Sequence, residues 1–230
     1  EKVWRLPVGS PQSRGKALVN IFPLSKDERI ESVMPLPDDE ESRNELDVMF
    51  ATRSGTVRRN KLSDFVRVNR NGKIAMKLDE GDGIVRVRMC SEDQDVMLTT
   101  ALGQCIRFKV TDVRVFAGRN STGVRGIRLA NGDHVISMGI LRHIDVTSAE
   151  ARAYLKHATA MRRAATGEDE DLSETVIEDD GDDGEEEAAL SAERIAALGA
   201  AEQFILTIAD DGMGKRSSAY DYRVTGRGGK

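Results

Sequence analysis

Short loops that combine glycine with arginine, lysine and small polar residues recur along the chain, and their chemistry suits the binding of phosphate groups. Glycine lets main-chain N–H groups approach a phosphate closely, basic side chains neutralise its charge, and Asn, Ser and Thr donate hydrogen bonds to it. Four such loops span residues 10–16, 69–73, 118–123 and 225–230. With basic residues on nearby strand-like segments, they give the candidate binding residues Arg14, Lys16, Arg58, Arg59, Arg70, Lys73, Arg107, Lys109, Arg119, Arg125, Lys215, Arg216, Arg227 and Lys230. Each of these, taken alone, has a second interpretation as a solvated turn or strand-edge charge.

No group of residues has the spacing that a catalytic or metal centre needs. The histidines lack metal-ligand spacing, and no nucleophile motif is present. The cysteines form no CxxC pair and are predicted to be reduced thiols packed in the core of a cytosolic protein. The residues concerned are His134, His143, His157, Tyr154, Tyr220, Tyr222, Cys90 and Cys105. We therefore predict that the chain carries no active site, metal or cofactor of its own.

The net charge of −5 conceals an uneven distribution. Residues 1–147 carry 24 Lys and Arg against 20 Asp and Glu, residues 148–202 carry 5 against 16, and residues 203–230 carry 5 against 3. An acidic block thus lies within a mildly basic chain, so the average charge does not exclude a nucleic-acid partner. Aromatic residues make up only 4% of the chain, which argues against base stacking as the main mode of binding. No apolar run approaches a membrane span, and no signal-peptide pattern is present.

The basic residues recur because the sequence itself repeats. Three segments each have a β-rich run, a turn that ends in glycine and a second run with basic residues, which is the pattern of a β-hairpin. They cover residues 47–59, 95–107 and 204–216. Two series of residues share the same intervals of 48 and then 109 residues, namely Gly55, Gly103 and Gly212, and Asp64, Asp112 and Asp221. This common spacing favours a true repeat over three unrelated hairpins.

Two further strand-like segments precede each hairpin. The nearer segments lie at residues 29–34, 83–88 and 134–138, and each follows an acidic turn. The farther segments lie at residues 15–19, 72–76 and 123–127. The unit is about four strands in about 48 residues, the size of one propeller blade. Because a blade cannot bury both faces alone, successive blades should pack side by side. We predict an all-β, propeller-like array of four-stranded blades in a partial ring, with an ordinary sandwich as the alternative.

Several runs resemble the C-terminal domain of the DNA gyrase A subunit family, a similarity that extends over residues 1–142 and 203–230. The runs that carry it are residues 3–7, 15–24, 27–30 and 121–129. The resemblance implies a β-pinwheel, a circle of four-stranded blades that exchange strands and whose rim binds and bends double-stranded DNA. It also implies a bacterial, cytoplasmic, nucleoid-associated enzyme that introduces negative supercoils. In it, this part would join the rest of the A subunit, together with the B subunit, in an A2B2 assembly, with ATP and Mg²⁺ used elsewhere.

The sequence departs from that family at its hallmark Gln-Arg-Arg-Gly-Gly-basic-Gly box, which is absent in full. Residues 12–16 and 226–230 are partial echoes of it. The family's tyrosine nucleophile and metal-binding acids belong to other domains or to the partner subunit. Two other interpretations stay open. One is the C-terminal domain of a topoisomerase IV subunit, whose blades are usually fewer and less regular, and the other is a protein-interaction propeller that binds an acidic partner.

Residues 143–202 are predicted to interrupt the third repeat and so divide the chain into blades at 1–142, an insertion and a continuation of the blades at 203–230. Thr147 to Glu150 has the pattern of a helix-capping box. The apolar side chains that then share one helical face are Ala151, Tyr154, Leu155, Ala158 and Met161. Residues 168–187 hold 13 acidic and no basic side chains and are predicted to be disordered, before a second helix at 190–198. The insertion is either a neutral surface excursion or an acidic mimic of DNA that competes for the basic rim.

Overall fold

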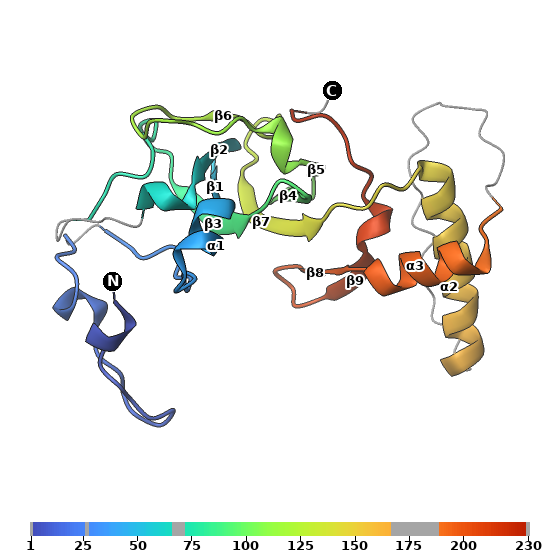
Figure 1. Cartoon of the computed structure of the whole chain (residues 1–230), viewed down its shortest axis with the longest axis horizontal. Helices are drawn as coiled ribbons and strands as arrows, with labels where there is room; N and C mark the ends of the chain where they lie inside the picture. Colours follow the sequence, from blue (N-terminus) through green and yellow to red (C-terminus); the bar gives the residue numbers. More distant parts are fainter. Residues whose placement is uncertain (1, 26–27, 66–71, 167–188, 229–230) are drawn as a thin grey trace.

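The computed structural model describes residues 2–25, 28–65, 72–166 and 189–228. Its strands are β1 (Asp47–Thr52), β2 (Thr56–Lys61), β3 (Ile84–Cys90), β4 (Gln94–Thr100), β5 (Cys105–Lys109), β6 (Val124–Arg125), β7 (Val135–Arg142), β8 (Phe204–Ile208) and β9 (Gly214–Ser218). Its α-helices are α1 (Glu40–Glu45), α2 (Ser148–Thr166) and α3 (Ala192–Ala201). The 3₁₀ turns are η1 (Val3–Arg5), η2 (Leu18–Asn20), η3 (Leu62–Phe65), η4 (Val110–Asp112) and η5 (Ala219–Asp221). The strands lie between an N-terminal segment at one end and α2 and α3 at the other (Figure 1).

The three predicted hairpins are confirmed. β1 pairs antiparallel with β2, β4 with β5, and β8 with β9. Each hairpin turns at a glycine with positive φ, which is 85° at Gly55, 87° at Gly103 and 85° at Gly212. Side chains other than glycine adopt that backbone conformation only at a cost. A 3₁₀ turn (η3, η4 or η5) follows each hairpin, so the repeat seen in the sequence is also a repeat of structure.

The strand that follows a hairpin, rather than the one before it, completes that hairpin's sheet. The sheets have the order β3-β1-β2-β6, which we call blade 1, β5-β4-β7, blade 2, and β8-β9, blade 3. The short strand β6 follows the second hairpin in the chain but pairs with β2 of the first. The predicted grouping of residues 83–88 with the second hairpin and 134–138 with the third is therefore wrong. The exchange of a strand between neighbours, which the resemblance implied, is present.

Three predicted strands do not form. Residues 15–19 overlap η2, and residues 29–34 and 72–76 are irregular apart from an isolated bridge at Gly72. The topology explains the first two, because strands at these places in the repeat pair with an earlier hairpin and the described residues before 29 form none. Residues 72–76 still contribute to packing, since Met76 is buried against blade 1.

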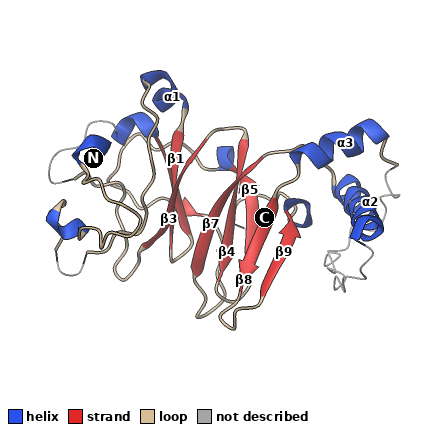
Figure 2. Cartoon of the chain, turned by 90° about the horizontal axis from the view of Figure 1, so that it is seen from below, coloured by secondary structure: helices blue, strands red, loops and turns tan. Residues whose placement is uncertain are grey.

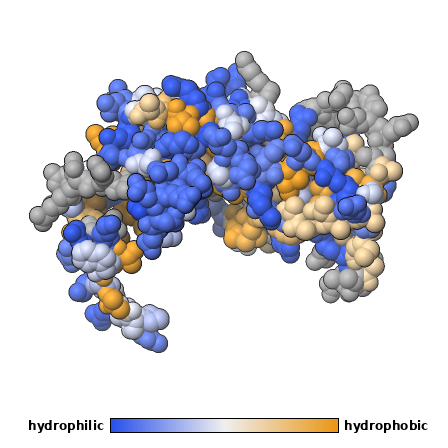
Figure 3. All heavy atoms as spheres, viewed as in Figure 1, coloured by the Kyte–Doolittle hydropathy of each residue, from blue (hydrophilic) through white to orange (hydrophobic). Residues whose placement is uncertain are grey.

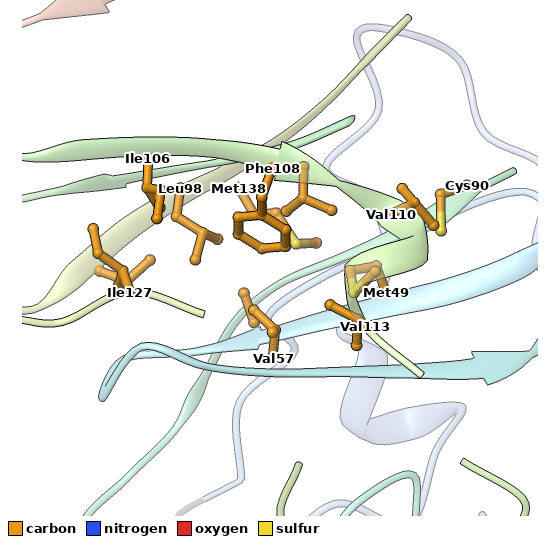
Figure 4. Close-up of a cluster of buried hydrophobic side chains, with 13 residues drawn as sticks. Met49, Val57, Cys90, Leu98, Ile106, Phe108, Val110, Val113, Ile127 and Met138 are labelled. Atoms are coloured by element: carbon orange, nitrogen blue, oxygen red, sulfur yellow. The ribbon is translucent and has the colours of Figure 1, made fainter. Parts of the chain in front are cut away.

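Blades 1 and 2 pack face to face over the largest cluster of buried side chains (Figure 4). Met49 and Val57 of blade 1 lie in it with Leu98 and Phe108 of blade 2, and all four have 0% exposure. Full burial of side chains of this size contributes roughly 1.5–3 kcal/mol each. The side-by-side packing of blades predicted from the repeat is thus the main source of the hydrophobic core.

The two cysteines differ in their surroundings. Cys90 is 1% exposed within the core, as predicted. Cys105 is exposed, contrary to the prediction, because it directly follows the hairpin turn at the start of β5. Among the described residues, no helix is long and apolar enough to cross a membrane.

The two helices of the insertion form at the predicted places and pack against blade 3 (Figure 2). The capping box is present, since the Thr147 hydroxyl accepts from the Glu150 N–H at 3.1 Å and the Glu150 carboxylate accepts from the Thr147 N–H at 3.0 Å. Tyr154 packs edge-on against Tyr220, with ring centroids 5.3 Å apart. Met161, which is predicted to lie on the apolar face, is 60% exposed, because the apolar contacts of α2 do not extend that far along the helix. Residues 168–187 lie outside the described residues, so their disorder stays a prediction.

The Tyr154 hydroxyl makes this packing sensitive to high pH. Burial, together with the hydrogen bond that the hydroxyl donates to Glu202 at 2.9 Å, raises the pKa of Tyr154 to about 12. A tyrosine in an unfolded chain ionises at about pH 10. The neutral hydroxyl therefore stabilises the folded state fully below about pH 10, and this contribution is lost as the pH rises to about 12.

We expect the free energy of unfolding of the Tyr154→Phe variant to depend less on pH between about pH 10 and 12. Urea unfolding at each pH, with tyrosinate absorbance recorded in parallel, measures the effect. Burial also raises the pKa of Tyr220, so part of the dependence should remain. An unchanged pH profile in the Tyr154→Phe variant would contradict the assignment.

Candidate nucleic-acid interface

Arg59 on β2 is buried, with 3% exposure, and connects blade 1 to blade 2. Its guanidinium pairs with Asp47 at 2.6 Å and with Glu92 at 2.6 Å. It also donates to the main-chain oxygens of Val110 and Val113 around η4, at 3.4 and 3.3 Å. Burial disfavours the charged form, but the hydrogen bond and charge of Asp47 outweigh it and raise the pKa of Arg59.

Arg107 makes equivalent contacts with one buried carboxylate and with the next 3₁₀ turn at the following blade boundary. It is 5% exposed and pairs with Asp95 at 2.8 Å. It donates to the main-chain oxygens of Ala219 at 2.7 Å and Tyr222 at 3.4 Å, around η5 of blade 3. The prediction that Arg59 and Arg107 contact phosphate is therefore wrong. Each guanidinium is buried, pairs with a buried carboxylate and donates to main-chain oxygens of the next 3₁₀ turn.

Blade 3 lacks this buried pair. Arg216 stands in the third hairpin where Arg107 stands in the second, but Phe204 takes the place of Asp95. The Arg216 guanidinium lies over the Phe204 ring, 3.7 Å from its centroid, and Arg216 is exposed. The arginine at this repeat position thus forms a buried ion pair in blades 1 and 2 and is exposed at the surface in blade 3.

Arg58 is also buried, with 0% exposure, and supports the loop 118–123 from below. It donates to the main-chain oxygen of Gly118, to the main-chain oxygen and hydroxyl of Ser121, and to Asn60 at 2.8 Å. Burial, followed by the nearby charge of Arg114, lowers the pKa of Arg58. Since it has no exposed surface, Arg58 does not contact DNA directly, which corrects that prediction.

The other candidate residues are at or near the surface. Four are exposed on or beside the strands, namely Lys109, Arg125, Lys215 and Arg216. Arg14 and Lys16 are exposed in the N-terminal segment, and Lys73, Arg119 and Arg227 are partly exposed. Arg70 and Lys230 lie outside the described residues. The predicted track is thus reduced to its loop residues and the exposed ends of the strands.

The fold brings Arg125 and Arg227 together from two successive repeats. Arg227 donates to the main-chain oxygen of Arg125, and to that of Asp112 at 3.2 Å. Gly228 lies beside them, since a Cβ placed there would be 3.9 Å from Arg125 Nε. Figure 3 shows that hydrophilic side chains cover most of the visible face of the blades. Arg125 and Arg227 are the clearest pair of adjacent surface cations among the predicted residues.

Lys73 and Arg119 line a hollow of about 610 Å³ whose charge is mixed. The lining residues are Glu40, Arg43, Asn44, Ser63, Asp64, Lys73, Ala117 and Arg119. Arg119 donates to the main-chain oxygen of Ile74 at 3.1 Å, and Lys73 donates to that of Asp64. The carboxylates oppose an anion here, so the hollow is a weaker phosphate site than the surface around Arg125.

Several exposed basic residues are missing from the predicted set. Arg114 and Arg128 flank the loop 118–123, and Arg114 lies over the Phe116 ring at 3.9 Å. On α2, the exposed residues Arg152, Lys156 and Arg163 share the face opposite Tyr154. A charge count restricted to that helix would find them, because averaging over residues 148–202 masks them. In the ranges that the structure covers, no cluster of three or more His, Cys, Asp or Glu is arranged to hold a metal ion.

Comparison with known proteins agrees with this architecture. The chain matches the family described as "DNA gyrase C-terminal domain, beta-propeller" over residues 46–91, 94–142 and 203–230. The first two ranges hold β1 to β3 and β4 to β7, so they follow the observed strand grouping except for the exchanged strand β6.

Proteins named as the A subunit of DNA gyrase are similar over the whole chain. That of Granulibacter bethesdensis is 52% identical over 100% of the chain and 25% of its own length, and that of Rickettsia bellii is 43% identical over 99% and 24%. The chain thus spans about a quarter of the length of these curated relatives. A crystal structure of a topoisomerase IV C-terminal domain aligns with a TM-score of 0.51 and 26% identity, over 57% of this chain and 40% of that one. This chain belongs to the DNA gyrase C-terminal domain family, with its beta-propeller fold.

Proposed function

We propose that this chain binds duplex DNA on the exposed basic surface of its blades and bends it, as the DNA-wrapping part of a gyrase A subunit. The observation that carries the proposal is the adjacency of Arg125 and Arg227, which come from successive repeats and lie side by side at the surface. A repeat that places cations at successive blades gives a curved track for the phosphate backbone. Contacts of this kind are largely independent of base sequence.

The wider assignment follows from the family and from the names of the relatives. In the whole protein, this part would support ATP-dependent negative supercoiling with the rest of the A subunit, together with the B subunit, in an A2B2 assembly. ATP and Mg²⁺ would be used outside this chain, and the protein would act in the bacterial cytoplasm at the nucleoid. Residues 1–142 and 203–230 would form the wrapping blades, with 143–202 as an insertion. A pure sample of this chain is expected neither to cleave DNA nor to hydrolyse ATP.

A double charge reversal tests the track. We expect Arg125→Glu with Arg227→Glu to weaken binding to all duplex sequences alike. The plot of log K for DNA binding against log salt concentration has a negative slope. Its magnitude should decrease by about 0.9 for each phosphate that is no longer neutralised, or about 1.8 for both. Fluorescence anisotropy over a salt series measures the slope, and a bending readout on longer duplexes reports wrapping.

The matched control is Arg152→Glu with Arg163→Glu on α2, which makes the same change in net charge outside the blades. This control is expected to keep most of the affinity and the slope. An equal loss in both variants would assign the effect to net charge, and the blade track would then be rejected. Binding of an acidic protein in place of DNA, lost in the Arg125→Glu with Arg227→Glu variant, would favour the interaction-propeller alternative.

A further inference from the structure

The loop 118–123 is held over blade 1 by an arginine that, among the described residues, forms no ion pair with a carboxylate. The partners of the Arg58 guanidinium are Asn60, Gly118 and Ser121, with Nη1 donating to the Ser121 hydroxyl at 2.8 Å. Its charge lies 4.5 Å from the Phe116 ring centroid. A fully buried cation whose nearest partners are neutral retains the ability to attract an anion above it.

The contacts of Arg58 fix the direction of two peptide groups. The carbonyls of Gly118 and Ser121 point toward the guanidinium. Because a trans peptide holds its C=O and N–H on opposite sides, the N–H groups of Arg119 and Thr122 point away from Arg58. In the part of the chain that the structure covers, no acceptor is found for either N–H. Ser121 and the neighbouring Asn120 are exposed, so this side of the loop is open to solvent.

The equivalent loop over blade 2 is built differently, which separates this feature from the general repeat. The residue that takes the place of Arg58 in the second hairpin is Ile106. The residue that takes the place of Arg119 in the next loop is Gly228, and its N–H donates to the Gly126 oxygen at 2.9 Å. That loop therefore has neither the buried cation nor the open N–H group.

We propose that the N–H groups of Arg119 and Thr122 bind one phosphate of the DNA backbone, and that Arg58 is the positioning residue that orients them. Outward main-chain N–H groups above a buried positive charge are the kind of donors that bind anions in other proteins. The steric fit of the loop depends on Gly123, where a Cβ would lie 2.5 Å from the Val57 oxygen. The partner class rests on the proposed function, while the site itself rests on the geometry of Arg58. One blade would then hold the DNA by main-chain hydrogen bonds and the next by side-chain charge.

The test is an amide chemical-shift titration of the ¹⁵N-labelled 230-residue chain with inorganic phosphate and with a short DNA duplex. We expect the amide resonances of Arg119 and Thr122 to shift saturably with both probes. The amide resonance of Gly228 should not shift when inorganic phosphate is added. Arg58→Met should abolish the two shifts and weaken duplex binding about tenfold, the scale of one charge-assisted hydrogen bond. Arg58→Lys keeps the charge but not the fork that reaches Gly118 and Ser121, and should also lose the shifts.

Ser121→Ala is the second variant if Arg58→Met does not fold, because it removes one anchor of the loop and should reduce the shifts. Unperturbed amides of β4 show that the blades remain intact. Duplex binding that shifts the surroundings of Arg125 but leaves Arg119 and Thr122 unmoved would overturn the site and leave the proposed function standing. Phosphate shifts without any duplex binding would make this a site for an adventitious ion only, and the proposed function would fail with it.

Discussion

Replacing Arg107 with methionine is expected to lower the free energy of unfolding by about 3–5 kcal/mol, the typical cost of removing one partner of a buried ion pair. Asp95 has 0% exposure and would lose its arginine partner, while the contact of its other carboxylate oxygen with His143 at 2.9 Å would remain. The main-chain oxygens of Ala219 and Tyr222 would lose a donor as well. Because these acceptors belong to blade 3, the boundary between blades 2 and 3 should separate first.

The chain contains its own control for this experiment. Arg216 occupies the same repeat position, but it is exposed and stacks over Phe204 without a buried carboxylate. Exposed contacts of this kind contribute about 0.5–1 kcal/mol, so Arg216→Met should have a much smaller effect. Urea unfolding of both variants gives the comparison. In thermal unfolding, Arg107→Met should lower Tm by roughly 6–20 °C, at about 2–4 °C per kcal/mol for a domain of this size. Equal losses in the free energy of unfolding of the two variants would contradict a stabilising role for the buried Arg107–Asp95 pair.

The parts of the fold that sequence can predict are those set by local chemistry. Three features locate all three hairpins: a turn glycine, which has positive φ in the structure, a following strand, and the same interval of 9 residues from that glycine to an Asp. The capping box likewise fixes the start of α2, because Thr147 and Glu150 satisfy each other's N–H groups. These signals lie within a few residues of each other and need no knowledge of the rest of the chain.

Pairing between repeats is not accessible in the same way. A strand such as β3 has the same pattern whether it joins the hairpin before it or after it, so its partner is decided by how blades pack. Residues 29–34 illustrate the consequence: they have a strand-like sequence but no earlier hairpin in the described residues to pair with. β-propensity therefore identifies a segment that could form a strand, but it does not show whether that segment pairs with another strand.

The burial of three candidate arginines escapes prediction because a basic residue on a strand is ordinarily a surface charge. A signal is present in two of them, since the interval from Asp47 to Arg59 equals that from Asp95 to Arg107. An acid and a base at a fixed interval in two repeats indicate an ion pair, and the change to Phe204 in the third repeat marks where the pair is lost. Arg58 gives no such signal, because its partners are main-chain and neutral groups of a loop far along the chain.

The acidic stretch of the insertion is expected to have the largest effect on DNA binding. Removing residues 168–187 deletes 13 acidic side chains and changes the formal net charge from −5 to +8. The stretch is tethered to blade 3 through α2 and α3, which pack against Tyr220. Tethering gives an intramolecular competitor an effective concentration of about 1 mM. If its own dissociation constant for the basic surface is about 0.1 mM, a value typical of weak non-specific binding, DNA binding is weakened about tenfold.

We therefore expect the deletion to tighten duplex binding about tenfold at low salt. The gain should shrink toward physiological ionic strength, where exposed charges are screened over about 8 Å. Replacement of the same residues by an uncharged Gly/Ser segment of equal length is the control for chain closure, and it should behave like the deletion. Anisotropy titrations of the full chain and both variants, each over a salt series, measure the difference. Equal affinities at low salt would make the insertion a neutral excursion. Weaker binding by both variants would mean that the acidic residues support DNA binding, which electrostatic repulsion and competition cannot produce.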